Sequence, residues 1–283
     1  MSTNTVANVV RASVARLPQS DTATLDVQVL LATVLNVGRS FFYTWPDKLL
    51  DEDALAKFEQ LLLRRINGEP IAYIVGEQEF WSLPLKVAPS TLIPRPETEL
   101  LVETILDKLQ LESAKGIDLG TGTGAIALAL ASEQPNWQIL GVDFNHDAVE
   151  LASKNKQSLS IDNVEFVQSS WLSNVDPKWL NQCDFIVSNP PYIDKKDPHL
   201  SQGDVRFEPS SALVADKEGL QDIIDIAQQS LNYLKPDSLL LLEHGFEQGE
   251  AVRSILTSFG YQHAATLKDL AGLDRITFAS SPK

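Results

Sequence analysis

Apolar residues recur every three or four positions through the first seventy residues of the chain, which is the spacing of one helix face. The pattern predicts helices over residues 3–15, 22–35 and 53–66. We therefore expect residues 1–72 to form a small helical domain at the N-terminus, with a role in recognising the substrate.

The second of these helices predicts a particular buried face. Its apolar residues at helical spacing, expected to lie together, are Leu25, Val29, Leu30 and Val34. The aromatic residues expected to pack the helices against one another are Phe41, Phe42 and Trp45.

Residues 73–95 have a different pattern. Apolar side chains alternate along the segment from Phe80 to Val87, and Pro84 and Pro89 interrupt it. Alternation of this kind is typical of strands, and prolines are typical of strand ends and turns. The segment is interpreted as a hairpin linker.

Strand and helix patterns alternate regularly from residue 96 to the C-terminus. The predicted helices cover residues 97–109, 125–133, 147–158, 219–234 and 247–258. The predicted strands cover residues 116–119, 138–142, 164–167, 185–188, 238–243, 261–266 and 275–278. Such alternation predicts an α/β domain over residues 96–283, with a doubly wound, mostly parallel sheet of seven strands covered on both faces.

Composition narrows the classes of function. The chain of 283 residues has a formal net charge of −15, which disfavours the broad basic surface that nucleic acids require. No apolar run is long enough for a membrane helix, and no signal peptide is present. The single cysteine, Cys183, is expected to fill the core beside a strand. We expect a cytoplasmic monomer that binds neither membranes nor nucleic acid stably.

A glycine-rich turn follows the first strand of the α/β domain. The run from Gly116 to Ala125 contains Gly120, Gly122 and Gly124, separated by Thr121 and Thr123. Glycines are needed where a chain turns tightly and a ligand lies against bare backbone. The pattern fits a dinucleotide or S-adenosylmethionine equally well.

Two carboxylates bear on that choice. Asp143 ends the next strand, twenty-one residues after Gly122, and is expected to accept both hydroxyls of an adenosine ribose with either cofactor. Asp118 lies just before the glycine turn, where a pyrophosphate would be repelled. S-adenosylmethionine instead carries a sulfonium and an ammonium, so Asp118 favours that cofactor.

Trp171 follows the third strand, near the expected place of the adenine ring, and its position is consistent both with contact to the ring's face and with an ordinary surface or core tryptophan. Ser169 and Ser170 precede it. Many enzymes that use S-adenosylmethionine to methylate a substrate have an acidic residue at this point, which accepts a hydrogen bond from the adenine amino group. An adenine hydrogen bond at this point is therefore not predicted.

The fourth strand runs into Asn189-Pro190-Pro191-Tyr192. Ligands of open parallel sheets bind beyond the carboxyl ends of the strands, so this tetrapeptide should face the methyl donor. The Asn189 side-chain oxygen and the Pro190 carbonyl are predicted to accept both hydrogens of a planar amino nitrogen and to stabilise the charge that develops on transfer. Tyr192 is predicted to form an aromatic wall against the planar group.

These motifs closely resemble those of the protein-(glutamine-N5) methyltransferases that modify peptide-chain release factors. The glycine turn and residues 189–192 carry the resemblance, together with residues 68–76, 93–99, 206–209 and 243–249. The last of these segments contains Glu-His-Gly followed by Gln-Gly. The likeness covers nearly the whole chain, and the Arg95 segment favours the release-factor branch over enzymes that methylate a ribosomal protein.

The resemblance implies a class I fold and S-adenosylmethionine as cofactor. It implies that residues 120–124, Asp143, Trp171 and Asn189 contact the cofactor. It also implies that residues 189–192, Pro191 included, hold the glutamine of the release-factor Gly-Gly-Gln motif. Arg206 and Glu208 are interpreted as a loop ion pair without a chemical role.

Other functions are less consistent with the sequence. An adenine-N6 or guanine-N2 nucleic-acid methyltransferase can use the same tetrapeptide on a flipped base, but it needs a phosphate-binding surface. A NAD-dependent oxidoreductase would leave the tetrapeptide unused, and a binding module that keeps only the cofactor fold would not need both Asp143 and Asn189. The four histidines, His146, His199, His244 and His263, lack metal-ligand spacing, so no metal is expected and these residues are interpreted as surface or packing residues.

Overall fold

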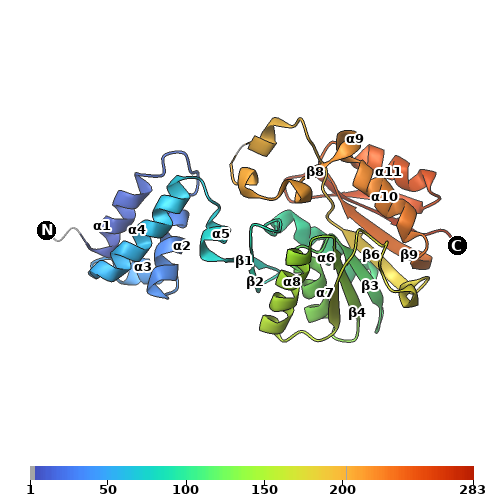
Figure 1. Ribbon diagram of the computed structural model, residues 1–283, viewed down its shortest axis with the longest axis horizontal. Coiled ribbons are helices and arrows are strands. Elements are labelled where there is room, and N and C mark those ends of the chain that lie inside the picture. Colours follow the sequence, from blue (N-terminus) through green and yellow to red (C-terminus); the bar gives the residue numbers. More distant parts are fainter. Residues whose placement is uncertain (1–3, 202) are drawn as a thin grey trace. The chain divides into compact units, whose positions relative to one another are not determined.

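The computed structural model of the protein describes residues 4–201 and 203–283. The chain divides into two compact units (Figure 1). The helical unit consists of Met1–Glu77 and Ser201–Phe207, and the sheet unit consists of Gln78–Leu200 and Glu208–Lys283. Each unit has its own apolar core.

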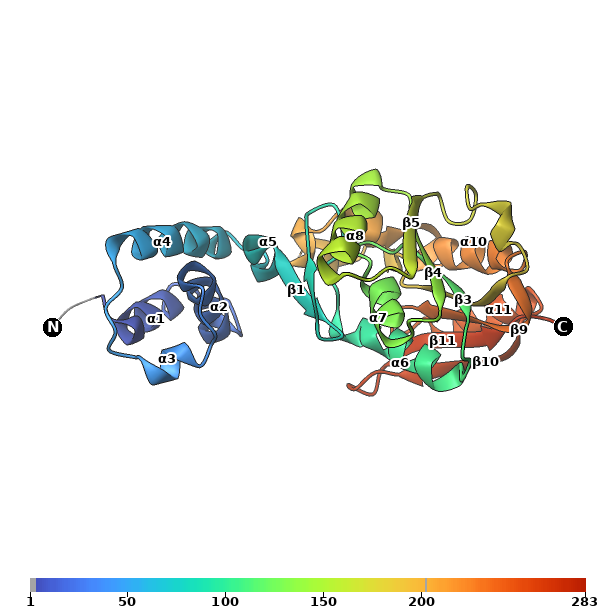
Figure 2. The same ribbon diagram turned by 90° about the horizontal axis from the view of Figure 1, so that it is seen from below.

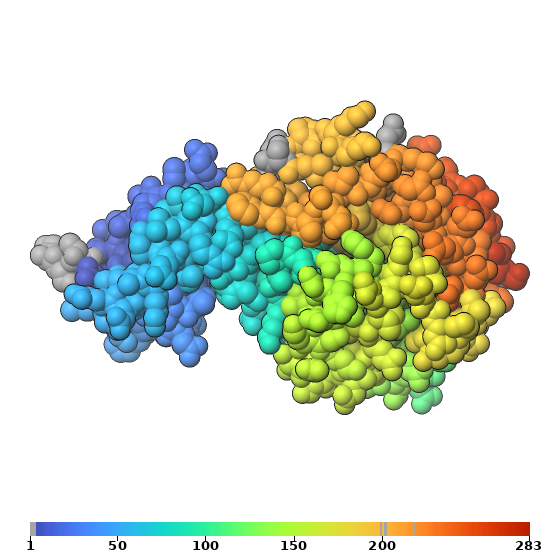
Figure 3. Space-filling model, viewed as in Figure 1, coloured from blue at the N-terminus to red at the C-terminus, as the bar shows by residue number. Residues whose placement is uncertain are grey.

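The helical unit contains the helices that the sequence predicts, and two short ones besides. They are α1 (Val6–Val14), α2 (Ala23–Leu35), α3 (Phe41–Thr44), α4 (Glu52–Ile66) and α5 (Ile71–Val75). Side chains fix where two of them begin, because the Thr5 hydroxyl accepts from the Asn8 N–H and the Asp51 carboxylate from the Ala54 N–H. These caps satisfy backbone donors that a helix leaves unpaired in its first turn. The surface of residues 4–77 runs from blue to cyan in Figure 3.

The buried face of α2 differs in part from the prediction. Leu30 is fully buried as expected, but Leu25 is 39% exposed, and the residues buried beside Leu30 are Val27 and Leu31. Phe42 is buried, whereas Trp45 is 59% exposed and does not pack the helices together. The prediction was wrong for Trp45 because it lies at the end of the four-residue helix α3, which the sequence pattern did not reveal.

The segment Ser201–Phe207 belongs to the helical unit although it lies far along the chain. The Arg65 guanidinium of α4 pairs with Asp26 of α2 at 2.8 Å and with Asp204 at 3.0 Å. Arg206 donates to the Asn67 carbonyl and lies over the Phe207 ring. Arg65 therefore joins two helices and a distant loop in one network.

The sheet unit is built on a seven-stranded sheet of order β10-β11-β9-β6-β3-β4-β5. Its strands are β3 (Lys115–Leu119), β4 (Gln138–Asp143), β5 (Val164–Gln168), β6 (Cys183–Ser188), β9 (Leu234–Glu243), β10 (Gln262–Lys268) and β11 (Asp274–Ser280). β3, β4, β5, β6 and β9 are parallel, and β11 is antiparallel to both of its neighbours. The predicted doubly wound, mostly parallel fold is confirmed.

Helices cover both faces of this sheet, as Figures 1 and 2 show. They are α6 (Glu99–Lys108), α7 (Ala125–Glu133), α8 (His146–Leu159), α9 (Asp216–Gly219), α10 (Gln221–Ser230) and α11 (Gly249–Ser258). The strands alternate between two apolar clusters, since Phe185 and Val187 of β6 pack with α6 and α7, whereas Cys183 and Ile186 pack with α10 and α11. Phe185, Ile186 and Val187 follow the two-residue period of a strand, and Cys183 departs from it at the register shift between Cys183 and Phe185. The predicted core position of Cys183 is confirmed.

A hairpin precedes the large sheet. It consists of β1 (Glu77–Phe80) and β2 (Leu83–Lys86), joined at Trp81 and Ser82, both of which have positive φ. Two such residues form the turn that suits the twist of a hairpin. Phe80 and Leu85 are buried in the core of the sheet unit. The expected hairpin is present, but α5 occupies the start of the segment 73–95 in which it was expected.

Short elements connect the main ones. β7 (Ile193–Asp194) pairs in parallel with β8 (Val214–Ala215), and the sequence pattern predicted neither. The 3-10 helices are Pro96–Thr98, Pro177–Trp179, Pro198–Ser201, Val205–Phe207 and Ser210–Ala212. Among the residues that the structure describes, no helix has both the length and the apolar character needed to cross a membrane.

Close approach of two central strands makes Gly116 a sensitive position. A Cβ atom there would lie 1.9 Å from the Phe185 ring, which is fully buried. We expect Gly116→Ala to lower the free energy of unfolding by about 3 kcal/mol or more, because overpacking in a rigid core forces the strands apart. Urea unfolding followed by circular dichroism measures this loss.

The control is Gly38→Ala, where the nearest atom to an added Cβ is the Ser40 hydroxyl at 3.9 Å. Its stability should change by less than about 1 kcal/mol. Equal stability of the Gly116 and Gly38 variants would contradict the rigid contact between β3 and β6.

Candidate active site

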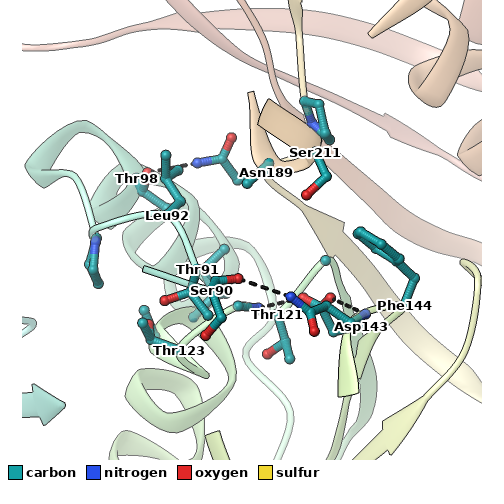
Figure 4. A pocket seen from close by; sticks show the side chains of 18 of the residues that line it. Ser90, Thr91, Leu92, Thr98, Thr121, Thr123, Asp143, Phe144, Asn189 and Ser211 are labelled. Carbon is teal, nitrogen blue, oxygen red and sulfur yellow. Dashed lines mark hydrogen bonds between the residues drawn. The ribbon is translucent and has the colours of Figure 1, made fainter. Parts of the chain in front are cut away.

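A cavity of about 260 Å³ lies at the carboxyl ends of the parallel strands. It is lined by the loops after β3, β4, β5 and β6, together with the segment before α6 (Figure 4). This is the edge of an open α/β sheet where ligands bind. Its volume is near the lower end of the ~300–1,000 Å³ typical of small-molecule pockets.

The glycine turn forms the floor of the cavity. Gly120, Gly122 and Gly124 all have positive φ, between 55° and 84°, which side chains disfavour. The N–H groups of Gly120 and Thr121 both donate to the Val142 carbonyl, at 2.8 and 2.9 Å. Gly120, Thr121, Gly122 and Thr123 line the cavity, and Gly124 is not among the described lining residues.

Asp143 joins the turn to the end of β4. Its carboxylate accepts from the Gly122 N–H and from the Asn145 N–H, each at 2.9 Å. Burial raises the pKa of this carboxyl above its ordinary value, although the two backbone hydrogen bonds oppose the shift. Asp143 lines the cavity, so its predicted place is confirmed by the geometry while its role toward a ribose stays a prediction.

Asp118 lies beneath the turn rather than in the described cavity lining. One oxygen accepts from the Thr121 hydroxyl at 2.6 Å and from the Ala127 N–H at 3.2 Å. Within residues 4–201 and 203–283, its other oxygen has no hydrogen-bond partner. Burial raises the pKa of Asp118 to about 7. The residue fixes the turn to α7, and direct contact with a cofactor stays a prediction.

Two aromatic side chains border the cavity. Trp171, at a positive φ of 47°, lies close to Gly120 and lines the cavity as expected. Phe144 also lines it and is 55% exposed. Sequence reasoning missed Phe144, although its position directly after Asp143 would have placed it there.

A further carboxylate in the lining was not predicted. Asp222 of α10 lines the cavity, and burial followed by repulsion from Asp225 raises its pKa. Ser169 and Ser170 line it too, and the Ser169 hydroxyl accepts from the Asn174 N–H. No local pattern predicts that Asp222 lines the cavity. The residue lies in α10, about fifty residues after β5, and only the tertiary structure brings it to the loop that follows β5. Acidic groups in and beneath the lining suit a cationic ligand and oppose a pyrophosphate.

The loop after β6 carries the predicted catalytic residues and brings one of them, Asn189, to the cavity. Its base is fixed where the Ser188 hydroxyl donates to the Leu119 carbonyl at 2.7 Å. Asn189 and Pro191 line the cavity, while Pro190 and Tyr192 are outside the described lining. The Asn189 amide nitrogen donates to the Thr98 hydroxyl at 3.1 Å, and the amide oxygen points away from Thr98 (Figure 4).

Both the hydroxyl and the backbone carbonyl of Tyr192 are hydrogen-bonded, one to the last residue of β9 and the other to a residue shortly after it. Its hydroxyl donates to Glu243 at 3.3 Å, and its backbone carbonyl accepts from the Gln248 side chain at 3.1 Å. Burial and the neighbouring Glu243 carboxylate raise the pKa of Tyr192, so its phenol stays protonated. The Glu-His-Gly and Gln-Gly segment therefore anchors the end of the catalytic loop.

Glu208 forms an ion pair with Arg95. The Arg95 guanidinium lies 2.6 Å from the Glu208 carboxylate, whose side chain is fully buried and also accepts from the Ile93 N–H. The recorded contacts of Arg206 are with the Asn67 carbonyl and the Phe207 ring, and the ion pair expected between Arg206 and Glu208 stays a prediction. The Arg95 pair links two segments that supply residues to the cavity.

The histidines differ in their surroundings. His244 is fully buried, with its ring nitrogens bonded to the Gly245 carbonyl and the Thr277 hydroxyl, and burial lowers its pKa. His146 and His263 are exposed. The side chain of His199 lies outside what the structure describes.

Comparisons with known proteins agree with this architecture. Residues 8–76 match the family model of the PrmC N-terminal domain, and residues 96–236 match that of the methyltransferase small domain. A methyltransferase from Pyrococcus furiosus, 16% identical, has the same fold with a TM-score of 0.55, over 80% of this chain and 100% of that one.

Closer relatives extend over nearly the whole chain. The release factor glutamine methyltransferase of Vibrio cholerae is 54% identical over 96% of this chain and 96% of its own length. That of Escherichia coli is 48% identical over 94% of this chain and 95% of its own length. The chain belongs to the release factor glutamine methyltransferase family, whose cofactor is S-adenosylmethionine.

Proposed function

We propose that this protein transfers a methyl group from S-adenosylmethionine to the side-chain amide nitrogen, N5, of the glutamine in the Gly-Gly-Gln motif of peptide-chain release factors. The observation that carries the proposal is the placement of Asn189 at the cavity with its amide nitrogen bound to Thr98 and its oxygen turned away from that residue. A carbonyl oxygen in this position can accept an N–H from a substrate amide.

The residues around the cavity fit the cofactor. S-adenosylmethionine supplies an electrophilic methyl group on a positively charged sulfur. The glycine turn leaves backbone exposed for close approach, Asp143 offers a carboxylate at the end of β4, and Trp171 and Phe144 offer aromatic faces. Asp118 and Asp222 add negative charge that favours a cation.

Residues 189–192 are assigned to the substrate amide. An amide nitrogen is a poor nucleophile because its lone pair is delocalised into the carbonyl. Acceptance of its two hydrogens by Asn189 and the Pro190 carbonyl orients the lone pair and stabilises the positive charge that develops. Tyr192 and Pro191 confine the planar group, and the methylated nitrogen sheds its extra proton to water.

Mass spectrometry tests the proposal. Purified release factor is incubated with the protein and isotope-labelled S-adenosylmethionine, then digested with trypsin. We expect one labelled methyl group on the peptide that contains Gly-Gly-Gln, and none on a release factor whose motif glutamine is replaced by alanine. Parallel incubations replace release factor with ribosomal protein or with nucleic acid, and label found only in one of these would overturn the assignment in favour of the corresponding alternative.

We also propose that residues 1–72 recognise the release factor. One glutamine side chain offers too little surface to select one protein among many, so discrimination needs contacts remote from the amide. Large apolar side chains are exposed on the helical unit, with Tyr43 at 74%, Trp45 at 59% and Leu49 at 59%. Exposed apolar side chains that lie together commonly mark interaction surfaces, and these three come from one short stretch of the chain.

The joint variant Tyr43→Ser with Trp45→Ser should raise the KM for intact release factor about tenfold, since aromatic contacts dominate many interfaces. Affinity for S-adenosylmethionine should not change, because both residues belong to the helical unit. The control is Leu270→Ser, which removes a fully exposed apolar side chain from the sheet unit. An unchanged KM for the joint variant would rule out this surface as the recognition site.

The protein is proposed to act in the cytoplasm as a monomer, without stable binding to nucleic acid. A net charge of −15 supports the last point, because phosphate binding depends on clustered cations. Light scattering during size-exclusion chromatography tests the monomer, and a mass of two or more chains would contradict it.

A further inference from the structure

Four side chains form a continuous hydrogen-bonded chain behind the cavity. The Tyr192 hydroxyl donates to one oxygen of Glu243 at 3.3 Å, and the Thr98 hydroxyl donates to the other at 2.8 Å. Thr98 in turn accepts from the Asn189 amide nitrogen at 3.1 Å. Both side chains of the catalytic loop that bear polar groups are thus connected to a single carboxylate.

The two inner members of this chain are shielded from solvent. Glu243 is 1% exposed and Thr98 is 5% exposed. Glu243 is the last residue of β9, which pairs with β6, the strand that leads into Asn189. Thr98 ends the 3-10 helix Pro96–Thr98. The sheet and the segment before α6 therefore fix the carboxylate and the hydroxyl independently of the catalytic loop.

The number of protons shared along these four hydrogen-bonded side chains decides whether the oxygen or the NH2 group of the Asn189 amide faces the cavity. An ionised carboxylate can only accept hydrogen bonds, so the single hydroxyl proton of Thr98 must go to Glu243. Thr98 can then only accept from its other neighbour, and the Asn189 amide must present its NH2 group to Thr98. The amide oxygen is consequently left for the substrate.

We propose that Glu243 is a positioning residue that acts through Thr98 to hold the Asn189 amide with its oxygen toward the substrate nitrogen. The proposal rests on the proposed function, since it concerns how the same site orients its acceptor. A protonated Glu243 could donate a hydrogen bond to the Thr98 hydroxyl. The Thr98 hydroxyl could then donate its own hydrogen bond to the Asn189 side-chain oxygen. The reversed amide would then present N–H groups to the N–H groups of the substrate.

The charges around Glu243 bear on its ionisation. Arg275 of β11 and the hydroxyls of Thr98 and Tyr192 favour the carboxylate, while Glu97 opposes it. Arg275 also pairs with Asp269 at 3.2 Å and donates to the His244 carbonyl. Burial dominates and raises the pKa of Glu243 to about 7. Since the carboxylate is the working form, kcat should rise as pH increases through about 7.

A set of variants in the full-length protein tests the relay once the wild type has been shown to methylate release factor. Thr98→Val keeps the shape of the side chain and removes the hydroxyl, and Glu243→Gln keeps the shape and removes the ionisation. We expect each to lower kcat on the order of 10- to 100-fold, because small misplacements of a catalytic group have effects of that size. Thr98→Ser should restore most of the rate that Thr98→Val loses.

The matched control is Thr104→Val. Thr104 is equally buried, and its hydroxyl donates only to the Leu100 carbonyl of its own helix, at 2.6 Å. Its rate should equal that of the wild type. Thermal unfolding and S-adenosylmethionine calorimetry on every variant separate a lost relay from a lost fold or a lost cofactor site.

The double variant and the pH profile give the readouts that a merely structural role would not change. If Glu243 acts through Thr98, Glu243→Gln should have little further effect in the Thr98→Val background. The loss of kcat below about pH 7 should disappear in Glu243→Gln and persist in the control Thr104→Val. Additive effects, a wild-type rate in Thr98→Val, or an unchanged acidic limb in Glu243→Gln would overturn the relay. Failure of the wild type to methylate release factor would instead overturn the proposed function.

Discussion

Replacing Asn189 with alanine is expected to slow methyl transfer about 100-fold or more while the protein stays folded. The variant loses the side-chain oxygen that accepts from the substrate amide, and preorganised polar contacts to a developing charge are typically worth factors of that size. Asn189 is only partly buried and packs into neither apolar cluster, so its removal should leave the sheet intact. Single-turnover kinetics with release factor measures the transfer step directly.

A companion variant separates chemistry from position. Asn189→Gln retains the amide but displaces it by one methylene group, and we expect a loss of similar size because the bond to Thr98 and the direction of the oxygen cannot both be kept. Thermal unfolding of both variants should match the wild type. A single-turnover rate for Asn189→Ala close to that of the wild type would exclude the assigned role.

Replacing Asp143 with alanine should weaken S-adenosylmethionine binding about 10- to 100-fold, with a smaller effect on transfer at saturating cofactor. A lost charge-assisted hydrogen bond costs about 1.5–3 kcal/mol, which corresponds to that range. The variant also leaves the Gly122 and Asn145 N–H groups without the acceptor that fixes the glycine turn. Titration calorimetry measures the affinity.

The pH dependence of that affinity provides a second readout. Burial raises the pKa of Asp143 above that of an ordinary aspartate. As the pH is lowered, the affinity of the wild type for S-adenosylmethionine should therefore begin to fall at a higher pH than it would if Asp143 had an ordinary pKa. The control Asp162→Ala removes an exposed carboxylate and should leave the affinity unchanged. Equal affinities for the two alanine variants would refute the ribose assignment of Asp143.

Local pattern was sufficient for most of the sheet unit. The helix predicted over residues 125–133 coincides with α7, and each of the seven predicted strands exists within a few residues of its predicted ends. Apolar runs in parallel strands and the glycine turn before α7 are strong local signals. β7 and β8 were missed because each has two residues and exists only through pairing with the other.

The site was predictable only where its residues follow strands. Asn189 and Asp143 each come directly after or at the end of a buried strand, so their position at the cavity follows from the topology. Thr98 and Glu243 are 91 and 54 residues from Asn189 along the chain, and only tertiary structure brings them to it. Asp222 was missed for the same reason.

Residues 201–207 have a consequence for any attempt to exchange the helical unit between relatives. The chain passes from one unit to the other three times, after Glu77, Leu200 and Phe207. A protein shortened to begin at Gly68 loses Arg65 and leaves Asp204 without the ion pair that binds its loop to α4. Such a chain should still bind S-adenosylmethionine, but it would keep residues 201–207 without most of the helical unit against which they pack.

A graft of residues 1–77 alone would therefore combine the helices of one relative with the loop of another. The pairing of Arg65 with Asp204, and of Arg206 with the end of α4 at Asn67, would have to be recreated across that junction. If the helical unit recognises the release factor, as proposed, transfer of substrate preference requires that segments 1–77 and 201–207 be exchanged together, because they form one unit although they are separated along the chain.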